Sequence, residues 1–159
     1  MRVIRALFVP AALVVSVTAA SADITGFIGS TTSPTNRPAR GFAVGAGILV
    51  VGFEFEYSDT AEDADAGAPA LRTGMGNVLL QTPVPIAGIQ PYFTTGGGGY
   101  RERLGSDATT HVGLNTGGGA KISLVGPLRV RLDYRVFRLN GSPRVNVVHR
   151  LYAGANLAF

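Results

Sequence analysis

His111 and His149 are the only two histidines in this 159-residue chain, and they are its best candidates for acid–base chemistry at neutral pH. Paired with Ser123 or Ser142 and a carboxylate, either one would supply the base and the nucleophile of a hydrolase. Neither serine lies in a recognisable nucleophile motif. The chain has no cysteine, which excludes thiol catalysis, disulfides and thiolate metal sites. We therefore expect no enzyme activity.

Motifs for phosphate, metal or cofactor binding are also missing from the sequence. The glycine runs 96–99 and 117–119 lack the G-x-x-x-x-G-K-[ST] pattern and open no predicted helix. Close contact between neighbouring strands explains them better, and we expect the two runs to lie alongside each other. The acidic segment 59–65 could hold divalent cations, but its spacing differs from that of an EF-hand loop. We expect a solvated loop there, with no bound metal and no cofactor.

The strongest chemical pattern is a set of charged residues at alternate positions. In the segment 128–139, Arg129, Arg131, Asp133 and Arg135 alternate with Val130, Leu132, Tyr134 and Val136. Successive side chains of a β-strand point to opposite faces, so this pattern predicts a strand with one ionic and one apolar face. A helix would scatter the same arginines around its circumference.

The same period of two recurs along the chain after residue 22. It predicts eight strands, within the segments 24–32, 41–48, 51–57, 71–81, 89–103, 111–124, 128–139 and 145–159. The blurred alternation in 71–81 and 89–103 suggests β-bulges. Between Ile48 and Val51 the apolar positions change parity, which predicts a tight turn. In the last segment, Val145 is expected on the same face as Leu157, opposite Asn146 and Arg150.

The first residues have the composition of an export signal. Arg2 and Arg5 precede the apolar run 6–17, and the small residues 20–22 form a cleavage pattern. We predict a signal peptide at 1–22, cleaved before Asp23, and one β domain at 23–159. Removal of two arginines reduces the formal charge from +4 to +2, so the basic composition does not indicate a nucleic-acid partner.

Two kinds of barrel fit eight alternating strands. A soluble lipocalin-like barrel has apolar side chains inside, around a ligand, whereas a transmembrane barrel has them outside, against lipid. Here the faces opposite the apolar ones combine charges with glycine and alanine, and small residues suit the narrow lumen of an eight-stranded barrel. The expected fold class is all-β: an eight-stranded antiparallel up-and-down transmembrane β-barrel.

The charged residues would then line the lumen. The last hairpin, folded about 140–143, is expected to place Asp133 opposite Arg150. Because both signs of charge are present, we expect a salt-bridge network that plugs the lumen, with a polar pore or binding surface as the alternative. The predicted lumen residues are Glu54, Glu56, Lys121, Arg129, Arg131, Asp133, Arg135 and Arg150.

The predicted signal peptide and three later segments carry a resemblance to a known family. The segments 118–124 and 126–135 look like the last hairpins, and 151–159 like the C-terminal strand, of the small outer-membrane β-barrels of the OmpA-like and porin-like superfamily. The resemblance implies a Gram-negative outer-membrane location, in contact with membrane lipid and lipopolysaccharide. It also implies that the barrel-assembly machinery recognises the last strand, with Tyr152, Leu157 and Phe159 as the signal residues.

The expected function is a structural, surface-interaction or narrow porin-like role in the outer membrane. The first alternative is a soluble periplasmic lipocalin-like barrel that binds a small apolar ligand. The second is an outer-membrane lipid hydrolase built around one of the histidines.

Overall fold

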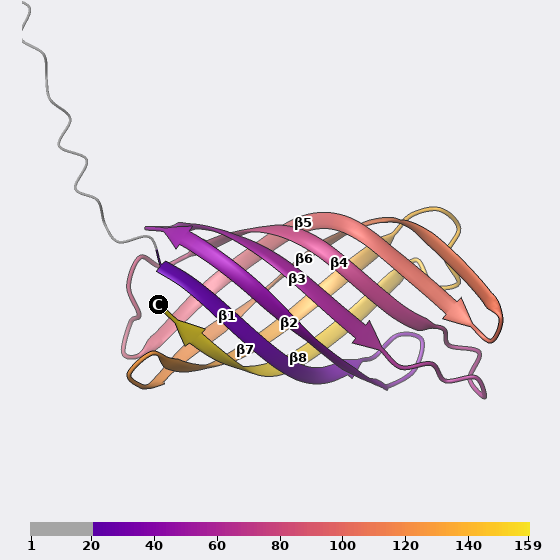
Figure 1. The fold of residues 1–159 in the computed structure, drawn as a ribbon, viewed down its shortest axis with the longest axis horizontal. Coiled ribbons are helices and arrows are strands. Elements are labelled where there is room, and N and C mark those ends of the chain that lie inside the picture. The colour runs from indigo at the N-terminus through magenta and orange to yellow at the C-terminus, as the bar shows by residue number, and fades with distance from the viewer. Residues whose placement is uncertain (1–20) are drawn as a thin grey trace, which may run out of the picture.

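Residues 21–159 form a closed barrel of eight antiparallel strands in a computed structural model (Figure 1). Each strand pairs with the next along the chain, and β8 pairs with β1. Closure leaves no unpaired strand edge, which a sheet in lipid requires. The strands are β1 (Ser21–Thr31), β2 (Arg37–Ile48), β3 (Val51–Thr60), β4 (Ala70–Gln81), β5 (Ile89–Leu104), β6 (Asp107–Val125), β7 (Leu128–Leu139) and β8 (Val147–Ala158).

The eight predicted strands and the antiparallel barrel are confirmed. The predicted tight turn is also present: Leu49 and Val50 connect β2 to β3, and Leu49 has a φ of 57°. The expected bulges in β4 and β5 are wrong, because the registers of β3–β4, β4–β5 and β5–β6 run without a shift. A register shift lies instead between Ser123 and Val125, at the end of the β6–β7 pair.

The connections differ between the two ends of the barrel (Figure 1). At one end, which we call the turn end, the strands are connected by residues 49–50, 82–88 and 126–127. β1 begins at this end and β8 ends there. At the opposite loop end, the connections are 32–36, 61–69, 105–106 and 140–146. The predicted signal peptide lies outside the described residues, except for Ser21 and Ala22 at the start of β1.

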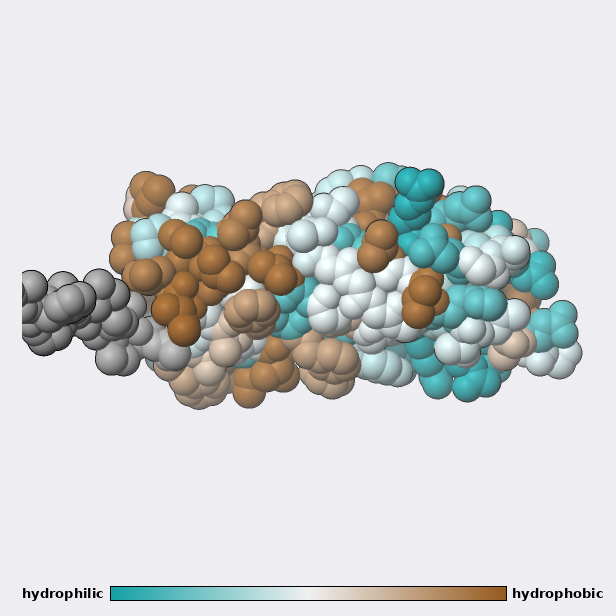
Figure 2. All heavy atoms as spheres, turned by 90° about the horizontal axis from the view of Figure 1, so that it is seen from above, coloured by the Kyte–Doolittle hydropathy of each residue, from teal (hydrophilic) through white to brown (hydrophobic). Residues whose placement is uncertain are grey.

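The outside of the barrel carries an apolar belt. Its residues occupy alternate strand positions, and their exposed fractions run from 39% for Val78 to 73% for Ile28. Figure 2 shows this surface over the half of the barrel nearer the turn end, with hydrophilic surface towards the loop end. A band about 25 Å tall is typical of membrane barrels. The belt includes Ile24, Ile28, Val44, Phe53, Phe55, Val78, Leu80, Phe93, Leu132, Tyr134, Leu151 and Leu157.

The inside holds a group of charged residues in the half nearer the turn end, and an apolar cluster towards the loop end, where Thr31, Arg37 and Thr60 are also buried. The charged group includes the buried residues Glu54, Glu56, Arg131 and Asp133. The apolar cluster is formed by Leu71, Met75, Tyr100, Phe137, Leu139 and Val148. The expectation that the inner face of β7 is wholly ionic is therefore wrong. The last two inward residues of β7, Phe137 and Leu139, are apolar and belong to this cluster.

The start of β8 also differs from the prediction. Val145 precedes the strand and packs against the apolar cluster from the 140–146 loop, while Asn146 is exposed. Strand alternation begins only at Val147, because the preceding residues have not yet joined the sheet. In the chain from Ser21 to Phe159, no helix is both long and apolar enough to cross a membrane.

Candidate functional site

The candidate site is a network of buried ion pairs across the lumen. Arg131 of β7 donates hydrogen bonds to both carboxylate oxygens of Glu54 on β3, the longer one at 3.2 Å. Its Nη2 also lies 3.2 Å from Oδ2 of Asp133. Arg135 donates to Glu54 at 2.7 Å and, through Nε, to Asp133 at 2.9 Å. The two arginines therefore share two carboxylates.

The network continues to β8 through a second glutamate. Arg135 Nη1 lies 3.0 Å from Oε2 of Glu56, and the other oxygen of Glu56 pairs with Arg150. Arg150 also donates to the hydroxyl of Ser58. The expectation that Asp133 faces Arg150 is wrong. The β7–β8 register pairs Asp133 with Tyr152 and Arg135 with Arg150, so the partner of Arg150 comes from β3 across the lumen.

The charges in this network cancel. Three guanidinium groups, of Arg131, Arg135 and Arg150, meet three carboxylates, of Glu54, Glu56 and Asp133. All six side chains are at most 2% exposed. An unpaired charge at such depth would cost several kcal/mol, so the balance of signs is a condition for burial. The sequence contained the correct residue types, and closure of the barrel brings them together.

Two tyrosines complete the network, and neither was among the residues predicted to line the lumen. The Tyr92 hydroxyl of β5 donates to Asp133 and accepts a 2.7 Å hydrogen bond from Nε of Arg131. The guanidinium of Arg131 lies 4.8 Å from the centre of the Tyr92 ring. Tyr152 stacks on Phe27, with ring centres 4.0 Å apart. The alternation of Gln90, Tyr92 and Thr94 with apolar neighbours was the available signal.

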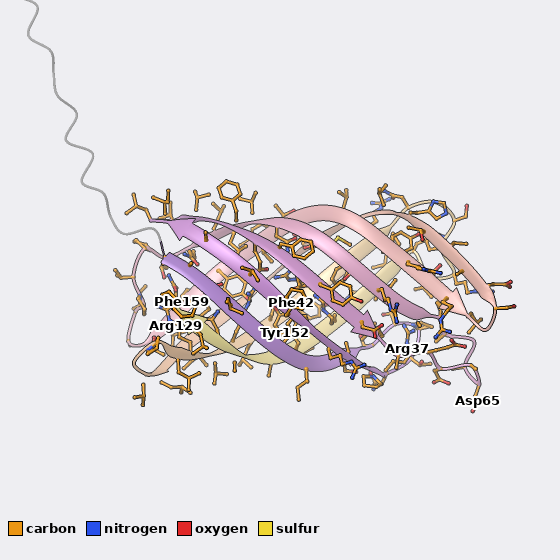
Figure 3. The ribbon with its side chains drawn as sticks, in the orientation of Figure 1. Arg37, Phe42, Asp65, Arg129, Tyr152 and Phe159 are labelled. Atoms are coloured by element: carbon orange, nitrogen blue, oxygen red, sulfur yellow. The ribbon has the colours of Figure 1, made fainter. Side chains whose placement is uncertain are left out.

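The remaining predicted lumen residues lie nearer the turn end. Lys121 of β6 pairs with Asp23 of β1, and both are largely buried. Arg129 donates a 3.1 Å hydrogen bond to Gln90 and is half-buried (Figure 3). Beside the Lys121–Asp23 pair, the free space measures about 10 Å³. A cavity needs about 10–15 Å³ to hold one water molecule, so this space has room for one water molecule at most.

Glycines make room for this filled interior. A Cβ on Gly119 would overlap the Leu132 carbonyl oxygen and lie 2.7 Å from the Tyr92 hydroxyl. A Cβ on Gly117 would lie 2.9 Å from the Cα of Arg135. The expectation that the two glycine runs lie alongside each other is wrong. The run 117–119 pairs with residues 92–94, and the run 96–99 pairs with 112–115.

In the described part of the chain, each histidine lies beside a tyrosine. Nδ1 of His149 shares a 2.7 Å hydrogen bond with the Tyr134 hydroxyl on the outer wall. His111 packs near Tyr100, with ring centres 6.3 Å apart. No hydrogen bond connects either histidine to Ser123 or Ser142 among residues 21–159.

The acidic segment forms contacts within the protein. Asp59 lies 3.4 Å from Arg72, and Glu62 lies 3.8 Å from Arg103. Oδ1 of Asp63 accepts a 3.2 Å hydrogen bond from the backbone N–H of Ala66. In the described range 21–159, no group of three acidic, histidine or cysteine residues is arranged to hold a metal ion.

The predicted assembly-signal residues are divided between the inside and the outside of the barrel, with Phe159 directly after β8. Tyr152 is 2% exposed and points into the lumen, whereas Leu157 and Phe159 are 42% and 71% exposed on the outside. Figure 3 shows Phe159 at the turn end. Its backbone N–H donates a 2.8 Å hydrogen bond to the carbonyl of Ala22 and helps to close the β8–β1 seam.

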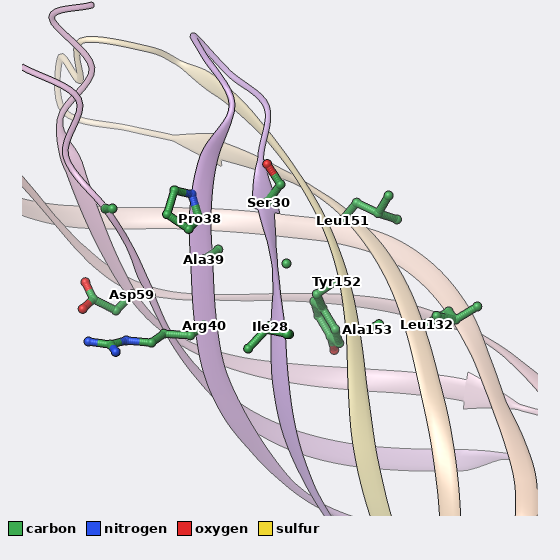
Figure 4. Close-up of a pocket in the computed structure, with 12 residues that line it drawn as sticks. Ile28, Ser30, Pro38, Ala39, Arg40, Asp59, Leu132, Leu151, Tyr152 and Ala153 are labelled. Atoms are coloured by element: carbon green, nitrogen blue, oxygen red, sulfur yellow. The ribbon is translucent and has the colours of Figure 1, made fainter. Parts of the chain in front are cut away.

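A hollow of about 950 Å³ lies on the outer wall where β8, β1 and β2 meet (Figure 4). Ile28, Leu151 and Ala153 line its floor, and Arg40 and Asp59 stand at one edge. Its apolar lining faces away from the lumen. A soluble lipocalin-like barrel would need an apolar space of this kind inside.

The comparisons with known proteins show similarity in fold. No protein-family model and no curated protein matches this chain. Among solved structures, the N-terminal β-barrel domain of Pseudomonas aeruginosa OprF has 15% identity and a TM-score of 0.67, covering 87% of this chain and 97% of that domain.

Two further structures extend this similarity. Ail, the attachment invasion locus protein of Yersinia pestis, has 15% identity and a TM-score of 0.57 over 88% of this chain and 99% of its own. The outer membrane enzyme PagL has 10% identity and a TM-score of 0.55 over 85% and 98%. The fold is therefore that of the small outer-membrane β-barrels.

Proposed function

We propose that this protein is an outer-membrane barrel whose lumen is closed by its own ion pairs, and that it has a structural or surface role without enzyme activity. The observation that carries this proposal is the polarity of the wall. On β3, Phe53 and Phe55 point outward and are 65% and 51% exposed. Glu54 and Glu56, which alternate with them along the strand, are buried inside the barrel. In water this arrangement would expose the apolar faces of most strands. Lipid around the barrel removes that cost.

A closed lumen is supported by the neutral network. The three arginines are held from several sides, and the space beside Lys121 is smaller than one hydrated ion requires. Towards the loop end, the apolar cluster that includes Phe137 and Leu139 is also buried inside the barrel. Conduction would require several buried ion pairs to separate at once. A narrow porin-like role is therefore the less favoured form of this proposal.

A surface role is supported by the part of the barrel beyond the belt. The β5–β6 hairpin has the two longest strands, of 16 and 19 residues, and they meet at the loop end. Arg37 holds two neighbouring loops together there, because it donates to the carbonyls of Ser33, Ala61 and Pro69. An ordered surface of this kind could present the loops to partners outside the membrane.

The proposal includes the lipid surroundings and the route of assembly. Acyl chains of outer-membrane lipid and lipopolysaccharide would cover the belt and fill the outer hollow at Ile28 and Leu151. The predicted signal peptide would direct export. The barrel-assembly machinery would act on β8 and the terminal Phe159, because Leu157 and Phe159 point outward and are free to be recognised before the seam with β1 closes.

Of the two alternatives, the lipocalin-like barrel conflicts with the buried charges and the apolar outer wall. The hydrolase keeps one supporting observation, because PagL is an outer membrane enzyme with a similar fold. Against it stands the hydrogen bond of His149 with Tyr134, which occupies Nδ1, the ring nitrogen that a carboxylate would need in order to orient the imidazole.

The first test is gel mobility of the membrane-extracted protein, with and without boiling, together with cell fractionation. We expect a heat-dependent shift and recovery in the outer-membrane fraction. The purified barrel should then give no steady conductance in a planar bilayer. A soluble periplasmic protein without a shift would overturn the membrane assignment, and stable open channels would overturn the closed lumen.

A further inference from the structure

A row of charged side chains crosses four strands on the outside of the barrel, on the loop-end side of the belt. Arg40 of β2 is the register partner of Asp59 on β3, which is paired with Arg72 on β4, which is paired with Arg101 on β5. Arg103 lies two positions beyond Arg101 on the same face. Like charges directly opposite each other on neighbouring strands destabilise a sheet, so the Arg72–Arg101 pair needs an explanation.

The protein supplies too few anions to compensate this pair. Asp59 lies 3.4 Å from Arg72, and Glu62 lies 3.8 Å from Arg103. Arg101 has no ion pair within the described residues 21–159. The side chains of Arg72 and Arg103 are also 60% and 57% exposed, so both retain unused donors. The cluster therefore has a net positive charge and an open centre.

A hollow of about 400 Å³ lies between β4, β5 and the 61–69 loop, and we call it the arginine hollow. Arg72, Arg101 and Arg103 line it together with Asp59 and Glu62, the carboxylates that pair with Arg72 and Arg103. Guanidinium groups bind phosphate oxygens through paired hydrogen bonds, and a phosphate between Arg72 and Arg101 would turn their repulsion into attraction.

A strip of bare backbone connects this hollow to the belt. Gly74 and Gly76 of β4 pair with Gly99 and Gly97 of β5, and all four face outward. The strip then reaches Val78 in the apolar belt. A Cβ on Gly74, Gly76 or Gly99 would meet no atom closer than 3.9 Å, so packing within the protein does not require glycine at these three positions, whereas a Cβ on Gly97 would lie 3.1 Å from Leu114. The flat strip leaves space for a long molecule lying along the wall.

We propose that the arginine hollow binds the phosphate groups of an anionic outer-leaflet glycolipid, whose acyl chains run along the glycine strip to the belt. This inference rests on the proposed membrane location. A lipid is favoured over a soluble polyanion because the arginines stand on the strand wall, in line with the belt. A soluble ligand bound at Arg72 would not contact the glycine strip that leads from the hollow to the belt.

The test measures binding of diphosphoryl lipid A to the full barrel, folded in neutral maltoside micelles, by native mass spectrometry. Arg101→Gln should weaken binding by about tenfold or more, since charge-assisted hydrogen bonds contribute about 1.5–3 kcal/mol. Arg138→Gln is the matched control, because this outward arginine on β7 pairs in register with Leu114 and Val147. Equal losses in the two variants would indicate diffuse attraction and overturn the site.

Two more measurements separate the lipid from other anions and from misfolding. Gly74→Val leaves the three arginines in place, and valine is a residue type favoured in β-strands. Its side chain would obstruct the glycine strip, so the variant should bind lipid A more weakly and pyrophosphate as tightly as the parent does. If pyrophosphate binds as tightly as lipid A, and Gly74→Val has no effect, the ligand is a soluble polyanion and the lipid assignment is wrong.

Stability without lipid gives an independent readout. Arg101→Gln should unfold no earlier than the parent in neutral micelles, because it removes the repulsion with Arg72. A lower unfolding midpoint would show that Arg101 is structural. All samples are first scored for heat-dependent gel mobility. If the parent protein shows the heat-dependent shift but does not bind lipid A, only this site is refuted. If the parent protein shows no heat-dependent shift, the proposed function is refuted.

Discussion

Replacing Glu54 by glutamine tests whether the buried network behaves as one charge-balanced unit. The glutamine keeps the shape of the side chain but removes the negative charge that faces Arg131 and Arg135. The network would then contain three cations and two anions at sites that are almost fully buried. Breaking a buried pair in this way costs about 3–5 kcal/mol. We expect the free energy of unfolding of the barrel to fall by that amount.

The matched control is Asp59→Asn, which breaks the ion pair with Arg72 on the outer surface. The two side chains of that pair are 28% and 60% exposed, and exposed pairs contribute about 0–1 kcal/mol. Both variants are measured by urea titration in the same micelles, followed by circular dichroism because the chain has no tryptophan. Superimposable folding and unfolding curves are required before free energies are compared.

A double variant distinguishes charge balance from loss of packing. Glu54→Gln combined with Arg135→Gln restores neutrality and should recover part of the lost stability, with a coupling energy of about 0.5–3 kcal/mol. If Glu54→Gln costs no more than Asp59→Asn, the lumen is wetter than the structure implies. The reasoning for a plug made of ion pairs would then be refuted.

Three further predictions concern the wall, the close strand contacts and the loops. Phe53→Arg should destabilise the membrane-inserted barrel by about 2–4 kcal/mol, whereas Phe53→Leu should have little effect, as measured by urea titration in vesicles. Gly119→Ala should cost about 1–3 kcal/mol or prevent folding, while Gly26→Ala, whose Cβ would meet nothing within 4 Å, should stay within about 0.5 kcal/mol. Arg37→Ala should speed protease cleavage within 61–69 without changing the heat-dependent gel shift, and an unchanged cleavage rate would show that its three carbonyl contacts do not hold the loops.

The strands and their faces could be predicted from the sequence because alternation is a local property. Once 128–139 is recognised as a strand, the backbone places Arg131 and Asp133 on one face and Leu132 on the other. The parity change at Ile48–Val51 likewise marked the β2–β3 turn without any long-range information. These inferences needed only neighbours along the chain.

The partners of the charged residues could not be predicted in the same way. Asp133 was expected to face Arg150, but the register of the last hairpin depends on where β8 begins, and the residues up to Asn146 remain in the loop. The contact of Arg150 with Glu56 crosses the lumen between strands that do not pair. Local patterns contain no information about such contacts.

From the sequence alone it follows that this chain forms alternating strands with charges of both signs on one face, because side-chain direction in a strand has a period of two. The mixture of these charges with glycine and alanine also predicted that this face lines the lumen. Only the tertiary structure showed that Arg131, Arg135 and Arg150 share three carboxylates in one buried group. Barrel closure is the physical reason. It fixes all eight registers together, and it brings β3 opposite β7 and β8 only when the last strand meets the first.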